Sequence, residues 1–179
     1  STKLNVKRAN KRPFTFIEIL IVLTCILMIA GFFTINIRSA LNEQTFIAES
    51  GELLSQIELA QDLNSLFGID LEMEFKEENG ILKTRLIPTG VITESFERLI
   101  KESERQYGFT AVFEGKGFNS QNNFKLSFYD RGYHPPLGVL KLNGYKELYL
   151  ALYGFPHPLS YSEDPISVQG IEQKNMALY

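Results

Sequence analysis

Side chains that carry out catalysis or bind metals are scarce in this chain of 179 residues. Its single cysteine, Cys25, excludes an intramolecular disulfide and any multi-cysteine zinc or iron–sulfur site. The two histidines, His134 and His157, stand in proline-rich stretches, where exposed turn residues are expected. The sequence also has no glycine-rich phosphate loop and no G-x-S-x-G or H-E-x-x-H motif. We therefore predict that the protein is not an enzyme and binds no cofactor.

Acidic residues offer too few ligands for a metal ion. Glu163 and Asp164 are adjacent, but calcium needs about six to eight oxygen ligands, so we predict a solvated surface and no metal site. Four further acids follow one another closely near the middle of the chain: Glu72, Glu74, Glu77 and Glu78. Their spacing indicates the solvated face of a hairpin, and their charge argues against DNA binding there.

One charge lies inside an apolar segment and is the most informative in the chain. Residues 14–37 contain a single ionisable group, Glu18, and about 20 apolar residues suffice for a helix that spans a bilayer. A carboxylate in such a helix costs about 2.5–3.5 kcal/mol near the membrane centre. Two interpretations stay open: Glu18 lies near the interface and is hydrated, or it pairs with a cation that another subunit or a freed amino terminus supplies. Cys25, in the same segment, is predicted to be an inert packing residue.

The charges before this segment predict its orientation. Five basic residues and no acid precede it: Lys3, Lys7, Arg8, Lys11 and Arg12. By the positive-inside rule they place the N-terminus in the cytoplasm and the rest of the chain across the membrane. A secretory signal peptide is the alternative, but its apolar core usually has about 7–15 residues, whereas residues 19–37 form a longer uncharged run. We therefore expect a retained, single-pass helix.

The segment RPFTFIEILIVL resembles the N-terminal signature of type IV pilins and pseudopilins. In this family a short basic leader is followed by a cleavage point, a Phe, and a Glu as the fifth residue from that Phe, as in Phe14 to Glu18. The resemblance implies that a prepilin peptidase cleaves between Pro13 and Phe14, that Phe14 is N-methylated, and that Glu18 neutralises the amino terminus of a neighbouring subunit. The family nearly always has Gly in place of Pro13, and proline restricts the backbone there, so the sequence leaves open whether the leader is removed.

The helical pattern continues beyond the apolar segment. Apolar residues recur at three- and four-residue steps: Phe46, Ile47, Leu53, Leu54, Ile57, Ala60, Leu63 and Phe67. Gly68 follows as a helix stop. We predict a basic leader over 1–13, a transmembrane helix over 14–37, and an amphipathic helix over 38–67 that packs on a soluble domain.

From Gly68 onward the apolar period changes to two, which is typical of strands. The Asn79–Gly80 pair predicts a hairpin turn, and Thr93 is expected to cap a helix over 94–107 that presents Phe96 and Tyr107 on one face. The predicted strands cover residues 69–76, 81–87, 109–113, 124–129, 137–142 and 147–153. The tail from Gly154 shows no period and is predicted to be irregular. The predicted fold class is α+β, with a long N-terminal helix packed on an antiparallel β-rich domain over 68–179, as in pilins.

Two functions follow from the resemblance. In the first, the chain is a pseudopilin, a structural subunit of a type II secretion pseudopilus, and its soluble part resembles H-type minor pseudopilins. In the alternative, it is a FimT-like minor type IV pilin involved in pilus assembly or DNA uptake. Residues after Ile37 carry 13 basic and 20 acidic side chains, which favours the first function and predicts no nucleic-acid partner.

The resemblance also implies the partners and the location of the chain. The expected partners are other pilin-like subunits, an inner-membrane assembly platform and a prepilin peptidase. The expected location is the inner membrane, with the N-terminus in the cytoplasm and the C-terminal domain in the periplasm.

Overall fold

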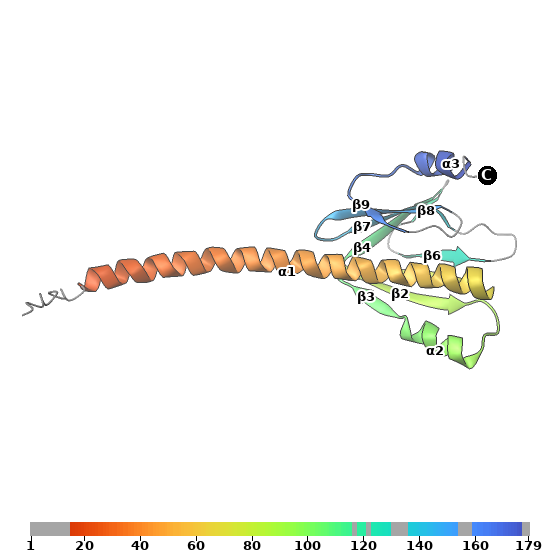
Figure 1. The fold of residues 1–179 in the computed structure, drawn as a ribbon, viewed down its shortest axis with the longest axis horizontal. Coiled ribbons are helices and arrows are strands. Elements are labelled where there is room, and N and C mark those ends of the chain that lie inside the picture. Colours follow the sequence, from red (N-terminus) through yellow and green to blue (C-terminus); the bar gives the residue numbers. More distant parts are fainter. Residues whose placement is uncertain (1–14, 116–117, 121–122, 130–135, 154–158, 177–179) are drawn as a thin grey trace, which may run out of the picture. The chain divides into compact units, whose positions relative to one another are not determined.

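The computed structural model describes residues 15–115, 118–120, 123–129, 136–153 and 159–176. These residues form an α+β fold in the order α1 (Phe16–Phe67), β1 (Leu71–Glu78), β2 (Ile81–Pro88), α2 (Glu94–Glu102), β3 (Arg105–Tyr107), β4 (Thr110–Gly115), β5 (Phe118–Ser120), β6 (Asn123–Phe128), β7 (Leu137–Asn143), β8 (Glu147–Tyr153), β9 (Tyr161–Ser162) and α3 (Val168–Met176) (Figure 1). Contacts divide the chain into two compact units, residues 1–41 and 42–179. Helix α1 begins in the first unit and ends in the second, which we call the domain.

Helix α1 ends where the sequence predicts. Gly68 has a φ of +62°, a left-handed conformation that glycine adopts without steric cost. Its N–H donates to the carbonyl of Asn64, and the N–H of Ile69 donates to the carbonyl of Leu63. The side-chain amide of Asn64 then donates to the carbonyls of Ile69 and Phe128. These bonds join the end of the helix to the start of β1 and to β6.

The first sheet has the strand order β3-β2-β1-β6, and its neighbouring strands are antiparallel. Strands β1 and β2 form the predicted hairpin, with Glu78 opposite Ile81 across the turn. Asn79 and Gly80 both have positive φ, +55° and +76°, as a two-residue hairpin turn requires. The period of two puts Leu71, Met73 and Phe75 on the buried face of β1.

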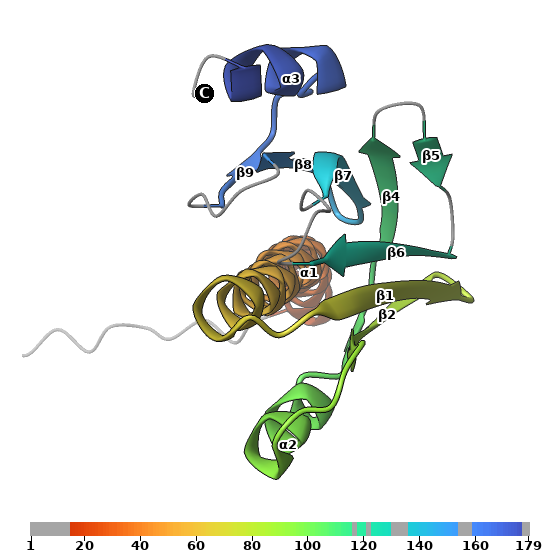
Figure 2. The same ribbon diagram turned by 90° about the vertical axis from the view of Figure 1, so that its right-hand side faces the viewer.

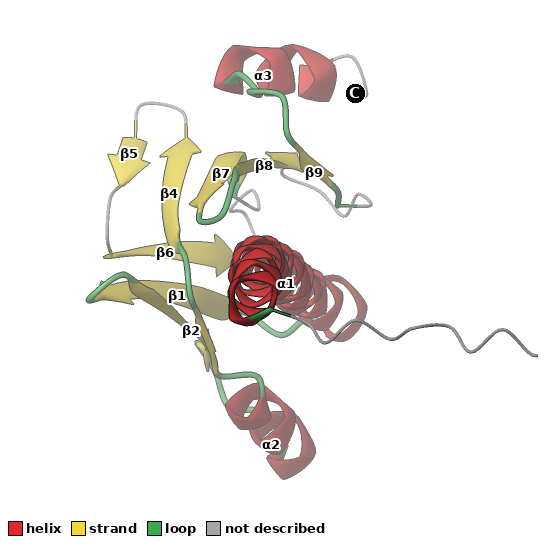
Figure 3. Cartoon of the chain, turned by 90° about the vertical axis from the view of Figure 1, so that its left-hand side faces the viewer, coloured by secondary structure: helices red, strands yellow, loops and turns green. Residues whose placement is uncertain are grey.

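The second sheet has the order β5-β4-β7-β8-β9, again antiparallel. Views along α1 show the domain part of this helix in the angle between the two sheets (Figures 2 and 3). Its buried face consists of five apolar side chains that join residues of both sheets in one core: Phe46, Leu53, Ile57, Ala60 and Leu63. Burial of this stripe is what holds the domain part of α1 on the sheets.

Helix α3 covers the other face of the second sheet (Figure 2). Ile171 is buried against Val139 of β7 and Ala151 of β8. The predicted irregular tail is therefore wrong for β9 and α3. Strands β7 and β8 carry apolar residues on both faces, which is typical of a sheet that other elements cover on both sides. This sequence pattern could have predicted an additional layer over the second sheet.

The helix expected over 94–107 is wrong in its last part. Helix α2 ends at Glu102, and Tyr107 lies in β3, opposite Leu82 of β2. Its ring stacks on Phe109 with centroids 5.3 Å apart, and the residue is almost completely buried. Helical spacing predicted that Tyr107 would share a helix face with Phe96. In the structure, pairing with β2 buries the ring, so tertiary packing determines that Tyr107 lies in a strand. Thr93 occupies the predicted N-cap position without a capping side-chain hydrogen bond.

The six predicted strands are confirmed as β1, β2, β4, β6, β7 and β8, with small shifts at their ends. Strand β5 was not predicted. Two members of the predicted apolar stripe, Ile47 and Phe67, are about half exposed or more, whereas its other described members are buried or partly buried.

A buried amide joins three elements of the domain to α1. Gln56 accepts hydrogen bonds at Oε1 from the hydroxyls of Thr84, at 2.6 Å, and Tyr107, at 3.4 Å. Its Nε2 donates to the carbonyl of Ser103, which follows α2. Burial raises the pKa of Tyr107 far above its usual range, so the phenol stays a hydrogen-bond donor well into the alkaline range.

Candidate assembly site at the start of helix α1

The first part of α1 has no apolar partner in the described part of the chain. Every side chain described between Thr15 and Leu41 is exposed. Among the described residues, α1 is the one helix long and apolar enough to cross a membrane, and none of its most apolar window is buried. A core helix of a soluble domain would be mostly buried, so that explanation does not fit residues 16–41. The length and composition fit the predicted membrane span.

Glu18 and Thr15 form a capping box at the start of α1. The N–H and the hydroxyl of Thr15 both donate to Oε2 of Glu18, at 2.8 and 3.0 Å. In return, the N–H of Glu18 donates to the carbonyl of Thr15, at 3.0 Å, and lies 3.4 Å from its hydroxyl oxygen. This reciprocal arrangement satisfies backbone donors that a helix start leaves without partners.

The capping box adds a local role for Glu18 that the sequence reasoning missed. The signal was present in the sequence as T-x-x-E, the motif of such boxes, directly before the apolar run. Both bonds from Thr15 end on Oε2, and Oε1 accepts no hydrogen bond from the described residues. One carboxylate oxygen of Glu18 is therefore hydrogen-bonded to Thr15, and the side chain is exposed, so it is accessible to a second group.

The remaining candidate residues are not brought together. Pro13, Phe14, His134 and His157 lie outside the described residues. Cys25 is exposed on α1. Glu163 forms an ion pair with Lys146. No group of three potential metal ligands occurs within the residues that the structure describes.

The solvated face of the first sheet is less acidic than the linear sequence suggests. Strand pairing places four basic residues among the predicted acids: Lys76, Lys83, Arg85 and Lys125. Glu72 accepts from Lys125 at 3.0 Å and from the hydroxyl of Tyr129 at 2.8 Å. Both contacts hold the pKa of Glu72 below its usual value. The acids of this face thus neutralise bases from neighbouring strands, which is a stabilising role.

Comparison with known proteins finds no matching family model, no matching curated protein and no matching solved structure.

Proposed function

We propose that this chain is a pseudopilin, a structural subunit of a type II secretion pseudopilus. In this proposal the first part of α1 anchors the chain in the inner membrane, and the domain lies in the periplasm. Its partners are other pilin-like subunits, an inner-membrane assembly platform and a prepilin peptidase that cleaves between Pro13 and Phe14.

One observation carries the proposal: a single continuous helix has two different surroundings. Its first part is apolar, exposed along its whole described length and marked by one carboxylate near its start. Its second part is the core helix of an antiparallel α+β domain. A protein of this organisation needs lipid or other helices around its first part, because about 20 residues of exposed apolar helix are not stable in water.

Glu18 supplies the specific contact between subunits. A carboxylate at membrane depth is costly alone, and a neighbouring amino terminus offers both charge and hydrogen-bond donors. Thr15 keeps one oxygen of Glu18 hydrogen-bonded before assembly. The other oxygen is then available for the incoming amine, so that the capping box orients the carboxylate and reduces the cost of inserting it.

Glu18→Gln separates the two roles of this residue. Glutamine also closes a capping box with Thr15, but it carries no charge. We expect Glu18→Gln to insert in the membrane and to lose most crosslinking to neighbouring subunits, measured in native membranes with a lysine- or cysteine-directed reagent. The matched control is Thr15→Val, which removes the hydroxyl bond and keeps the carboxylate; it should crosslink nearly as the wild type does. Unchanged crosslinking of Glu18→Gln would show that the residue only caps the helix.

DNA uptake by a FimT-like minor pilin is the second candidate, because four basic residues gather on one face of the first sheet. Their ion pairs weigh against it: Arg85 lies 2.6 Å from Glu74, and Lys125 lies 3.0 Å from Glu72. Titration of the full chain in detergent with duplex DNA at several salt concentrations decides between the candidates. Tight binding that weakens steeply with salt would favour DNA uptake.

A further inference from the structure

The turn between β7 and β8, residues 144–146, packs on the beginning of the domain part of α1. A side chain at Gly144 would overlap the ring of Phe46, so glycine lets the turn lie this close to the helix. Tyr145, the next residue, lines a small pocket whose α1 residues run from Asn42 to Glu49. The turn is therefore fixed at the level of the first residues of the domain part of α1.

Tyr145 differs from the other tyrosines in its exposure. Its side chain is 48% exposed, whereas every other tyrosine that the structure describes is buried or partly buried. The chain has no tryptophan and its first tyrosine is Tyr107, so the apolar first part of α1 contains neither residue. Tryptophan and tyrosine are the residues enriched where a protein crosses the membrane–water interface. If the first part of α1 spans a bilayer, an anchor of this type beside its outer end can come only from the domain.

The β7–β8 turn also lies at a suitable distance from the apolar segment. The uncharged run ends at Ile37, and Asn42 follows five residues later, which is about 7.5 Å along a helix. The headgroups add about 5–8 Å on each side of the hydrocarbon core of a bilayer. Asn42 therefore lies at the outer edge of the headgroup layer, within reach of the turn. Tyrosine suits this depth, because its ring is apolar and its hydroxyl is polar.

We propose that Tyr145 lies at the membrane–water interface on the side of the domain and contacts lipid headgroups there. The partner is a lipid surface, and the β7–β8 turn holds the domain against it. The inference rests on the proposed function, since it takes the first part of α1 as the membrane anchor. It goes beyond that function, because it assigns a second membrane contact to a residue of the domain.

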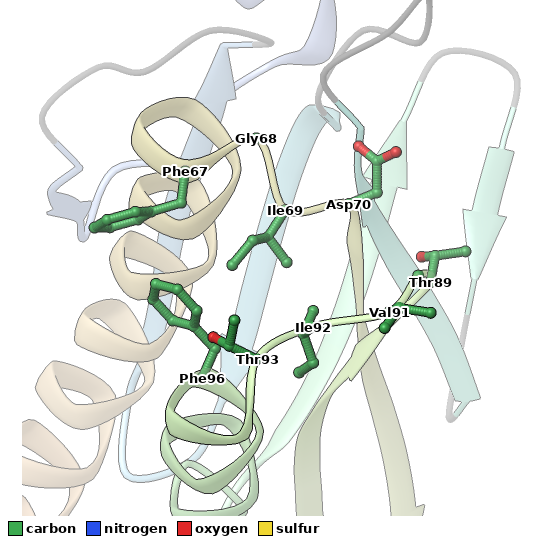
Figure 4. A pocket seen from close by; sticks show the side chains of 10 residues that line it. Phe67, Gly68, Ile69, Asp70, Thr89, Val91, Ile92, Thr93 and Phe96 are labelled. Atoms are coloured by element: carbon green, nitrogen blue, oxygen red, sulfur yellow. The ribbon is translucent and has the colours of Figure 1, made fainter.

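Single tryptophans test this position. The chain has no tryptophan, so Tyr145→Trp, Val91→Trp and Leu27→Trp each introduce one fluorescent probe. Val91 is the matched control: it is completely exposed and lines a pocket with Phe67, the last residue of α1 (Figure 4). Phe67 lies about 38 Å from Asn42 along the helix, far beyond the headgroups.

Lipids that carry a nitroxide quench a tryptophan close to them. Each full-length variant is reconstituted in vesicles of phosphatidylethanolamine and phosphatidylglycerol, with the nitroxide either on the headgroup or in the middle of the acyl chain. The headgroup nitroxide should quench Tyr145→Trp by about half and Val91→Trp only slightly, because an interfacial ring lies at headgroup depth. Equal quenching of these two variants would overturn the inference.

Leu27→Trp separates this inference from the proposed function. Its tryptophan lies in the middle of the apolar segment and should be quenched by the acyl-chain nitroxide. If it is quenched while Tyr145→Trp is not quenched by the headgroup nitroxide, the interfacial contact is wrong and the membrane anchor stands. If neither is quenched, the anchor fails as well. Tyr145→Cys in a Cys25→Ser chain, labelled with a fluorophore, repeats the measurement in case tryptophan disturbs the turn.

The lipid composition of the vesicles tests whether the ring or a charge makes the contact. Lys146, the basic residue of the turn, forms an ion pair with Glu163. A contact made by the ring of Tyr145 therefore does not depend on anionic lipids. Quenching of Tyr145→Trp should persist without phosphatidylglycerol and at high salt, which screens charge attraction. Loss of quenching under either condition would overturn the role assigned to Tyr145.

Discussion

The two parts of α1 have the same secondary structure and opposite surroundings. In residues 42–67, Leu53 and Ile57 have no exposed surface, because the two sheets cover them. In residues 16–41, side chains of the same type, such as Leu23 and Leu27, are more than half exposed. Hydrophobicity therefore predicts that a side chain needs a partner, but it does not say whether that partner is a sheet of the same chain, a lipid or another helix.

The largest expected difference between the two parts concerns truncation of a leucine. Leu53→Ala should lower the free energy of unfolding of the domain by about 2–5 kcal/mol, because it leaves a cavity in a packed core. The matched control is Leu27→Ala, the same change at an exposed position of the same helix, and it should leave this free energy unchanged. Urea unfolding in detergent, followed by tyrosine fluorescence, measures both. A loss with Leu27→Ala would contradict the separation of the two parts.

Insertion of a charge should show the reverse pattern. Leu27→Arg is expected to cost about 2.5–3.5 kcal/mol in the membrane and to reduce the fraction of chain that resists carbonate extraction, without changing domain unfolding. Gln44→Arg places the same charge on an exposed position of α1 in the domain and should leave membrane retention intact. If Leu27→Arg were retained as the wild type is, the first part of α1 would not be the anchor.

A buried polar contact also distinguishes the domain part of α1 from its exposed positions. Gln56→Leu should destabilise the domain by roughly 2 kcal/mol, because Thr84 and Ser103 each lose a hydrogen bond in a buried site. Gln44→Leu, at an exposed position of α1, serves as the control and should have little effect. Thermal unfolding by circular dichroism compares the two variants with the wild type. Equal stability of Gln56→Leu and wild type would show that the buried amide does not hold α1 to β2.

The smallest expected effect is a loss of domain stability in acid. The contacts with Lys125 and Tyr129 lower the pKa of Glu72 in the folded state, so its contribution is present above the ordinary pKa of a glutamate and is lost as the pH falls through the lowered value. The side chain of Lys125 is about half exposed, and solvent screening limits the effect to less than about 1 kcal/mol. Glu72→Gln should reduce the fall of the free energy of unfolding as the pH is lowered. Urea unfolding between about pH 3 and pH 6, which brackets the ordinary pKa of a glutamate, measures this change. An unchanged curve would contradict the assignment.

Features that depend on neighbours in the chain were predictable. Gly68 as a helix stop, the Asn79–Gly80 turn and the alternation of β1 are local patterns, and each is confirmed. The capping box of Thr15 and Glu18 is local as well and was readable from its spacing. The end of α1, the first hairpin and the isolation of Glu18 in an apolar segment were therefore predictable from local sequence patterns.

Features that join residues distant in the chain were not predictable from local patterns. Gln56 meets Thr84 across 28 positions, and the hydroxyl of Tyr161 donates to the carbonyl of Ser50 across 111 positions. The same holds for Tyr107, which left the predicted helix for a strand, and for α3, which covers a sheet that it follows in the chain. Local patterns carry no information on such pairings, because the free energy that selects them comes from burying surfaces of both partners together, and that surface exists only after the chain has folded.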